Sequence, residues 1–447
     1  MEPFAITGTI VDCSSDESRN LRINQQALLV INRQGTIVYR GVLDDLNKAK
    51  EEFDVTEVIE LRDHDEFLLP GFIDTHIHAS QYPNCGLALD LSLLKWLENY
   101  TYPLEAKIGQ DLNFARKVYE SVVSSTLSHG TTTAVYFATI QEEASVILAE
   151  TASRLGQRAF VGKVNMDQNS PDYYREGTRE YIAATKSFVN RVFDFEMKSD
   201  LVEPIITPRF APTCTRVLLE ELGTLAKEKG LRIQTHLSEC PSEVEWVRKC
   251  FPWSKNYTDV YNATGILTDK TILAHGIFLD HAELSVIKSV GAGIAHCPNS
   301  NNSIRSGSMA AANLQGVKVG LGTDCSGGYS PSMINAMRFA ISTSNNMYMA
   351  KECETSFHYN DVISLATRGS AKVCGVEDKV GGFDIGFQFD ALRIRMSVSN
   401  DTRLFGFETV EDMIHKFVFL GDERNLVQVF VKGKCVKNLL FAETQYN

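Results

Sequence analysis

The chain has 447 residues, and 44 Lys and Arg against 56 Asp and Glu give it a formal charge of −12 at pH 7. This acidic balance argues against a nucleic-acid-binding surface, which needs basic patches to displace counterions. Hydrophobic residues make up 44% and charged residues 22% of the chain, which is typical of a globular protein with a large core. Disordered, collagen-like and coiled-coil architectures are therefore excluded.

The distribution of cysteine predicts a reducing compartment. The ten Cys are scattered from Cys13 to Cys435 without a CxxC pair, unlike the dense cysteines of a small secreted scaffold. The first residues, MEPFAITGTIVD, contain no basic region typical of a signal peptide. No apolar run approaches the roughly 18 residues that would span a bilayer. We therefore expect a cytoplasmic protein without a membrane or nucleic-acid partner.

Both ends of the chain are rich in predicted strands. Near the start these are AITGTIVD, ALLVI, TIVYRG and VTEVIEL, with NRQG as a hairpin turn and a charged, helix-compatible stretch at 44–53. Near the end they are FDALRIRM and LVQVFVKGKCVKN. We expect residues 1–68 and 385–447 to assemble one small β-sandwich domain.

The middle of the chain, residues 69–384, alternates strands with helices. The strand-like runs are EFLLPGFIDTHIH, GTTTAVYFA, QRAFVGKVNMD, VEPIITPRFAPTC, LRIQTHLSE, TILAHGIFL, GAGIAHCPNS and VKVGLGTDC. Helix-compatible segments include 111–127, 141–155, 178–195, 216–229 and 241–249. Such alternation predicts a parallel sheet with right-handed crossovers, and eight units over about 300 residues match a (β/α)8 barrel.

Two features of this middle region bear on the interpretation. A doubly wound sheet is the alternative fold, but the chain contains neither GxGxxG nor GxxxxGK[ST], the phosphate-binding turns typical of that class. The segment 79–111 is rich in Tyr and Trp and shows no clear period, so we expect an active-site loop there.

Chemically capable side chains stand at the ends of the predicted barrel strands. His76 and His78 end the first run, and alternate residues of a strand point to one face. His236 ends the fifth run, His275 lies in the sixth and Asp324 ends the eighth. Taken singly, His275 as a core histidine and Asp324 as a helix N-cap are competing interpretations. Taken together, all lie at the strand ends where barrel enzymes build their sites.

Imidazoles with a carboxylate and no thiolate suit Zn²⁺ or another divalent transition metal. A metal with an open position lowers the pKa of water from about 16 to about 7. Glu239, three residues after His236, is placed to carry protons rather than to bind metal, and Asp324 can take the first proton from water. The predicted reaction is hydrolytic attack on an electrophilic carbon whose leaving group must be protonated.

The segments PGFIDTHIH, HLSE, LAHG, HCPNSN and GLGTD, in this order, resemble the cyclic deaminase branch of the amidohydrolase superfamily. More narrowly, HIHASQYPNCG at 76–86 and TPRFAPTC at 207–214 are similar to segments of the guanine deaminase family. The resemblance covers nearly the whole chain. It implies hydrolysis of guanine to xanthine and ammonia, one Zn²⁺ per subunit with iron as the alternative, and a homodimer.

Residue by residue, the resemblance implies three overlapping sets. The implied metal ligands are His76, His78, His236, His275 and Asp324, although His275 can instead hydrogen-bond the attacking hydroxide. The implied catalytic residues are Glu239, Asp324 and His275. The implied substrate-binding residues are Gln81, Arg209, Phe210, His236, Glu239 and Asp324. A guanidinium fork, an aromatic face and an amide that donates and accepts are suited to a purine.

Two other functions stay open at the level of sequence. A related amidohydrolase with the same metal site would deaminate another purine or heterocycle, such as an adenine-type base, S-adenosylhomocysteine or a triazine. Gln81 and Arg209 favour guanine over these. A non-catalytic amidohydrolase-like scaffold is the second alternative, and the presence of every candidate ligand together with Glu239 argues against it.

Overall fold

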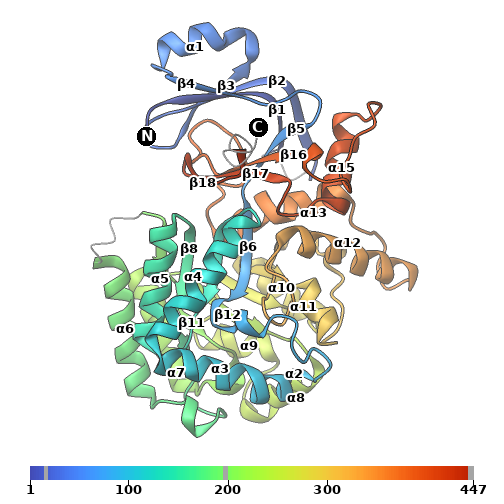
Figure 1. Ribbon diagram of the computed structural model, residues 1–447. Helices are drawn as coiled ribbons and strands as arrows, with labels where there is room; N and C mark the ends of the chain where they lie inside the picture. Colours follow the sequence, from blue (N-terminus) through green and yellow to red (C-terminus); the bar gives the residue numbers. More distant parts are fainter. Residues whose placement is uncertain (15–18, 195–199, 441–447) are drawn as a thin grey trace.

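The computed structural model describes residues 1–14, 19–194 and 200–440. A barrel of strands surrounded by helices forms the larger part, and a sheet built from both ends of the chain lies against one end of it (Figure 1). Within the described ranges, no helix is both long and apolar enough to cross a bilayer.

The barrel strands run parallel and follow the chain order. They are β6 (Phe72–His78), β7 (Thr131–Phe137), β8 (Arg158–Gly162) with β9 (Val164–Asn165), β10 (Val202–Pro204) with β11 (Thr207–Pro208), β12 (Ile233–Leu237), β13 (Thr271–His275), β14 (Gly293–His296) and β15 (Lys318–Leu321). A bridge between Ile206 and Ile233 joins the two halves of the barrel. Hydrogen bonds between β6 and β15 close the barrel. For example, Thr75 Oγ1 on β6 donates to the carbonyl of Leu321 on β15 at 2.8 Å. The predicted (β/α)8 architecture is confirmed.

The predicted helices also form, with bounds close to those expected. They are α4 (Leu112–Ser128), α5 (Glu142–Leu155), α6 (Thr178–Asp194), α7 (Arg216–Lys229) and α8 (Pro241–Cys250). Residue 195, the last of one predicted helix, lies outside the described residues. Local signals fix these ends: the Thr215 hydroxyl accepts from the backbone of Leu218 at the start of α7, and Gly230 ends it at φ 67°.

Further helices complete the shell of the barrel. They are α9 (Tyr257–Ala263), α10 (His281–Val290), α11 (Pro298–Ser303), α12 (Met333–Met349), α13 (Tyr359–Ser364) and α14 (Ser370–Cys374). A capping box starts α10, because Asp280 and Glu283 each bond the backbone N–H of the other.

The segment 79–111 is not a loop, as the sequence suggested, but a chain of short helical turns over residues 79–110, which we call the cover segment. It contains η2 (Ala79–Asn84), α2 (Leu93–Trp96), η3 (Leu97–Thr101) and α3 (Tyr102–Gln110). Each piece is too short to show a helical period, and prolines interrupt the run at 83 and 103. The helices of the cover segment lie at the end of the barrel away from the terminal sheet (Figure 1).

The terminal sheet has the order β18-β17-β16-β5-β1-β2-β3, with β4 beside β1. Its strands are β1 (Phe4–Cys13), β2 (Leu21–Ile31), β3 (Ile37–Val42), β4 (Glu57–Glu60), β5 (Glu66–Pro70), β16 (Ala391–Arg395), β17 (Leu426–Val431) and β18 (Lys434–Asn438). Two helices lie between strands of this sheet in the chain order: α1 (Leu46–Glu52) follows β3, and α15 (Val410–Leu420) precedes β17. Residues from both ends of the chain share one core beside this sheet, in which Phe4 of β1 stacks on Phe430 of β17 at 6.3 Å.

The chain passes from the terminal sheet into the barrel at Gly71, between β5 and β6. A Cβ at this position would lie 2.1 Å from Oγ1 of Thr132, so only glycine fits the crossing. Leu69 and Pro70 thus belong to the terminal sheet, immediately after residue 68. The division of the chain at residues 68 and 384 stays a prediction.

A buried ion cluster ties the two ends of the chain together. Glu66 on β5 accepts hydrogen bonds from Nη2 of Arg393 at 2.6 Å and from Nε of Arg395 at 2.5 Å, both on β16. Burial alone would raise the pKa of Glu66, but the bonds from these arginines and from the backbone of Arg62 hold it below its ordinary value. The charged form of Glu66 therefore stabilises the terminal sheet.

We predict that Glu66→Gln lowers the free energy of unfolding by about 3–5 kcal/mol, because it leaves two buried guanidinium groups beside a neutral amide. Since folding lowers the pKa of Glu66, its contribution is present above pH 4.5 and is lost as pH falls through the folded pKa. Denaturant titrations at several pH values test this. Glu57→Gln, on exposed β4, is the matched control, and equal stability of the two variants would contradict the prediction.

Candidate active site

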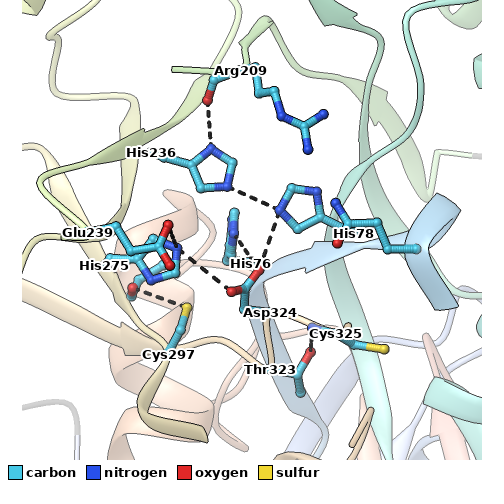
Figure 2. A network of polar contacts seen from close by, with 12 residues as sticks. His76, His78, Arg209, His236, Glu239, His275, Cys297, Thr323, Asp324 and Cys325 are labelled. Atoms are coloured by element: carbon cyan, nitrogen blue, oxygen red, sulfur yellow. Dashed lines mark hydrogen bonds and ion pairs between the residues drawn. The ribbon is translucent and has the colours of Figure 1, made fainter. Parts of the chain in front are cut away.

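Four side chains that could together hold a metal ion converge at the barrel end that carries the strand carboxyl termini (Figure 2). We call them the ligand group. His76 and His78 come from β6, His236 from β12 and Asp324 from the residues after β15. The Nε2 atoms of His78 and His236 are 3.1 Å apart, and Oδ1 of Asp324 lies 3.1 Å from Nε2 of His76. The donor atoms of all four lie within 4.8 Å of one another.

A second group shares the same aspartate. Nε2 of His275, at the end of β13, lies 3.5 Å from Oε2 of Glu239 and 3.8 Å from Oδ2 of Asp324. Asp324 therefore faces the imidazole group with one oxygen and the His275–Glu239 group with the other. The two groups form one continuous buried site.

Hydrogen bonds orient two of the imidazoles. Nδ1 of His236 lies 2.6 Å from the carbonyl oxygen of Arg209, which can only accept, so Nδ1 carries the proton. Nδ1 of His275 lies 2.9 Å from Oδ1 of Asn301 and donates in the same way. In the neutral form of each ring the lone pair then lies on Nε2, as outer hydrogen bonds typically arrange for metal-binding histidines.

The electrostatics of the site favour deprotonated donors. Burial lowers the pKa of His76, and it lowers those of His78 and His236 far below the ordinary histidine value, so these rings are neutral. Burial alone would raise the pKa of Asp324, but the neighbouring His76 imidazole, 3.1 Å away, holds it well below its usual range. A neutral set of imidazoles beside a carboxylate anion is what a divalent cation requires.

Two buried atoms support the same interpretation. Nε2 of His76 and Nε2 of His275 have no hydrogen-bond partner among the described residues, and each faces carboxylate oxygen instead. Buried polar atoms without partners are rare and costly in proteins. The residues therefore fit a divalent metal ion, and the nitrogen and oxygen donors without thiolate are typical of catalytic sites.

The backbone is strained at three residues of this site. Ser238, His275 and Asp324 have φ values of 51°, 71° and 45°, in the left-handed region that side chains other than glycine seldom adopt. Each such residue costs of order 1–3 kcal/mol, and such strain clusters at functional sites. The turns at these three positions direct side chains of β12, β13 and β15 to one point.

A cavity of about 440 Å³, counting its open mouth, adjoins the ligand group. Its walls include Leu93, Trp96 and Leu97 of the cover segment. The predicted site residues that line it are His78, Gln81, Arg209, Phe210, His236, Glu239, His275 and Asp324. His76 lies beneath it, in contact with Asp324. The structure thus brings every predicted site residue to one place.

Sequence reasoning missed Glu105, in α3 of the cover segment. Its fully buried carboxylate accepts from Nη1 of Arg209 at 2.8 Å, from Nε2 of Gln81 at 3.0 Å and from the Tyr174 hydroxyl at 2.7 Å. The Arg209 guanidinium also lies over the ring of Tyr102, 5.2 Å from its centroid. A buried Arg209 requires an anion nearby, but no local pattern indicates which acidic residue supplies it.

Glu239 is set up to exchange a proton near neutral pH. Burial raises its pKa to about 7, although the nearby His275 opposes the shift. Its Oε1 accepts from the Ser306 hydroxyl at 3.1 Å, and its backbone N–H donates to Glu243, a second carboxylate that the sequence analysis missed. A carboxyl group that titrates near the working pH can accept a proton and then return it.

Comparisons with known proteins agree with this geometry. The family model described as "Amidohydrolase family" matches residues 67–436. The guanine deaminase of Dictyostelium discoideum is 42% identical over 444 residues, covering 96% of this chain and 97% of that protein. The guanine deaminase of Homo sapiens is 43% identical over 428 residues, covering 93% of each chain.

A solved structure extends the likeness to three dimensions. The crystal structure of guanine deaminase from C. acetobutylicum with bound guanine in the active site superposes with a TM-score of 0.88. It is 31% identical and covers 97% of this chain and 100% of the other. The chain belongs to the amidohydrolase family, in the group that contains the guanine deaminases.

Proposed function

We propose that this protein hydrolyses guanine to xanthine and ammonia. One observation carries the proposal. A single cavity is lined both by members of the ligand group and by the buried polar side chains of Arg209 and Gln81, which can hydrogen-bond a purine. Relatives over 40% identical along nearly the whole chain are guanine deaminases, which supports the same substrate. The substrate class is a small purine.

We propose one zinc ion, held by His76, His78, His236 and Asp324, with iron as the alternative metal. A divalent cation bound there supplies hydroxide near neutral pH, because coordination lowers the pKa of water to about 7. His275 stays a predicted fifth ligand. Its place beside both Glu239 and Asp324 favours the alternative role, a hydrogen bond to the attacking oxygen.

The two carboxylates divide the proton transfers between them. Asp324, an anion at neutral pH, accepts the proton released when water attacks C2 of guanine. Glu239 protonates the neighbouring ring nitrogen N3, which makes C2 more electrophilic, then takes the second water proton from the new C2 hydroxyl and gives it to the departing amine. The proton on Asp324 then passes to Glu239, so both carboxyl groups recover their starting states. His275 stabilises the oxygen charge that develops at C2. Environments that separate two carboxyl pKa values are typical of such acid–base pairs.

We propose that residues on the cavity wall recognise the base. His236, Glu239 and Asp324 also contact the base there. Arg209 offers a planar donor fork to the guanine carbonyl or ring nitrogen, and Gln81 donates and accepts along the purine edge. Phe210 provides an apolar ring against the base. Glu105 bonds both Arg209 and Gln81, so we propose that it is a positioning residue for the substrate contacts.

The alternatives from the sequence are less well supported. An adenine-type base, S-adenosylhomocysteine or a triazine would share the metal site, but the two relatives compared above, at 42% and 43% identity, carry the name guanine deaminase. A buried ligand group and strained backbone at Ser238, His275 and Asp324 cost stability, and a non-catalytic scaffold would gain nothing from either. The homodimer and the cytoplasmic location stay predictions, and sedimentation of the purified protein tests the first.

Turnover is tested by the loss of guanine absorbance on conversion to xanthine. We expect guanine to be consumed, and Glu239→Gln to lower kcat by about 10²–10⁴ because proton delivery is removed. The variant should keep its metal, as measured by elemental analysis. Turnover of adenine but not guanine by the wild-type protein would refute the substrate, and near-normal activity of the variant would refute the shuttle.

Glu105→Gln should raise KM for guanine about tenfold or more while kcat falls much less, because Arg209 loses its anchor but the proton transfers are untouched. Metal content should stay at the wild-type value. The matched control is Glu98→Gln, an exposed glutamate of the same cover segment. A fall in kcat with unchanged KM would show that Glu105 does not act through substrate binding.

A further inference from the structure

Two free thiols meet beside the active site. Cys85 follows η2 in the cover segment, and Cys325 directly follows Asp324. Their Sγ atoms are 3.0 Å apart, although the residues are 240 positions apart in the chain. A disulfide bond is about 2.05 Å long, so the sulfur atoms need to approach by only about 1 Å to bond.

The two thiols differ in access. Cys325 is completely buried, whereas Cys85 is partly exposed and lies between the exposed residues Pro83 and Leu87. Space is also open next to Gly86, where an added Cβ would meet nothing within 4 Å. A small oxidant from solvent therefore reaches Cys85 first, with the Cys325 thiol already beside it.

The pair joins two walls of the site. On one side, the carbonyl of Cys325 accepts from the backbone N–H of His78 at 3.0 Å, so Cys325 is fixed to the strand ends that carry the ligand group. On the other side, Cys85 belongs to the cover segment, which contributes Gln81, Trp96 and Leu97 to the cavity. A covalent link between them would tie the cover segment to the base of the site.

We propose that Cys85 and Cys325 form a reversible disulfide that makes the enzyme sensitive to peroxide. In the first step the Cys85 sulfur attacks one oxygen of hydrogen peroxide: an S–O bond forms, the O–O bond breaks, and a sulfenic acid and one water result. The Cys325 thiol then attacks the sulfenic sulfur, the S–S bond forms and the second water leaves. Two thiols lose two protons and two electrons in total, and peroxide is reduced to two waters.

The link lowers activity through the cover segment. Because Cys325 is held by His78, most of the approach comes from Cys85, which draws η2 and the Gln81 side chain with it. Fixing a segment that walls the cavity slows the exchange of substrate and product, which often limits turnover. A dithiol reductant breaks the bond and restores the original arrangement.

The experiment treats the metal-loaded full chain with hydrogen peroxide and maps its disulfides by peptide mass spectrometry. We expect a peptide pair joining Cys85 to Cys325, and a several-fold fall in kcat/KM for guanine that dithiothreitol reverses. Cys85→Ser should keep the reduced activity and resist peroxide. Cys250→Ser, which removes another partly exposed thiol, should behave as wild type.

The two readouts separate this proposal from the proposed function on which its activity arm rests. Peptide mapping needs no turnover. If the reduced protein does not turn over guanine but still forms the link between Cys85 and Cys325, the proposed function is refuted and the disulfide is not. The proposal is overturned if Cys85 is oxidised to sulfinic or sulfonic acid without a link. It is equally overturned if the linked protein keeps full kcat/KM or if Cys85→Ser loses activity like wild type.

Discussion

The closure of the barrel between its last and first strands is the constraint on which the site depends. Buried Asp74 of β6 accepts from the backbone of His76, and it accepts from Thr323 through both the backbone N–H at 3.0 Å and the hydroxyl at 2.5 Å. One residue further on, Asp324 donates its backbone N–H to the carbonyl of His76 at 2.8 Å. These bonds place Asp324 against the histidines of β6, and without them the ligand group would lack its carboxylate.

Once Asp324 is in place, burial determines the charges of the site. The same desolvation that keeps His78 and His236 neutral raises the pKa of Glu239, whereas the surrounding imidazoles hold that of Asp324 low. In water the two carboxyl groups would titrate at similar pH values, but here their surroundings separate their pKa values. At neutral pH, Asp324 is therefore an anion, and Glu239 can both take up and release a proton.

Much of this arrangement could be predicted from the sequence, because local patterns carry it. Apolar runs ending in His76, His236 and Asp324 predict barrel strands with ligands at their carboxyl ends, and the structure has those strands. Helices such as 216–229 follow from caps and periodicity. The cover segment was wrongly expected as a loop, because turns of four to nine residues show no period.

What escaped prediction depends on contacts between distant segments. Glu105 is one acidic residue among many until the fold brings it to Arg209, and Cys85 is one thiol of ten until it meets Cys325. Only three-dimensional proximity distinguishes these residues from their equivalents elsewhere in the chain. Contacts between residues at the ends of predicted strands can therefore be expected from the sequence, whereas the contacts of Glu105 and Cys85, which lie outside the strands, cannot.

The central claim is that His76, His78, His236 and Asp324 hold one cation. Anomalous X-ray diffraction from crystals of the purified protein, recorded on both sides of the zinc absorption edge, tests it most directly. The account predicts a single peak bonded to these four side chains, with Zn–N and Zn–O distances of about 2.0–2.2 Å. A peak bonded to other residues, or zinc-replete protein without a peak among these four, would contradict it.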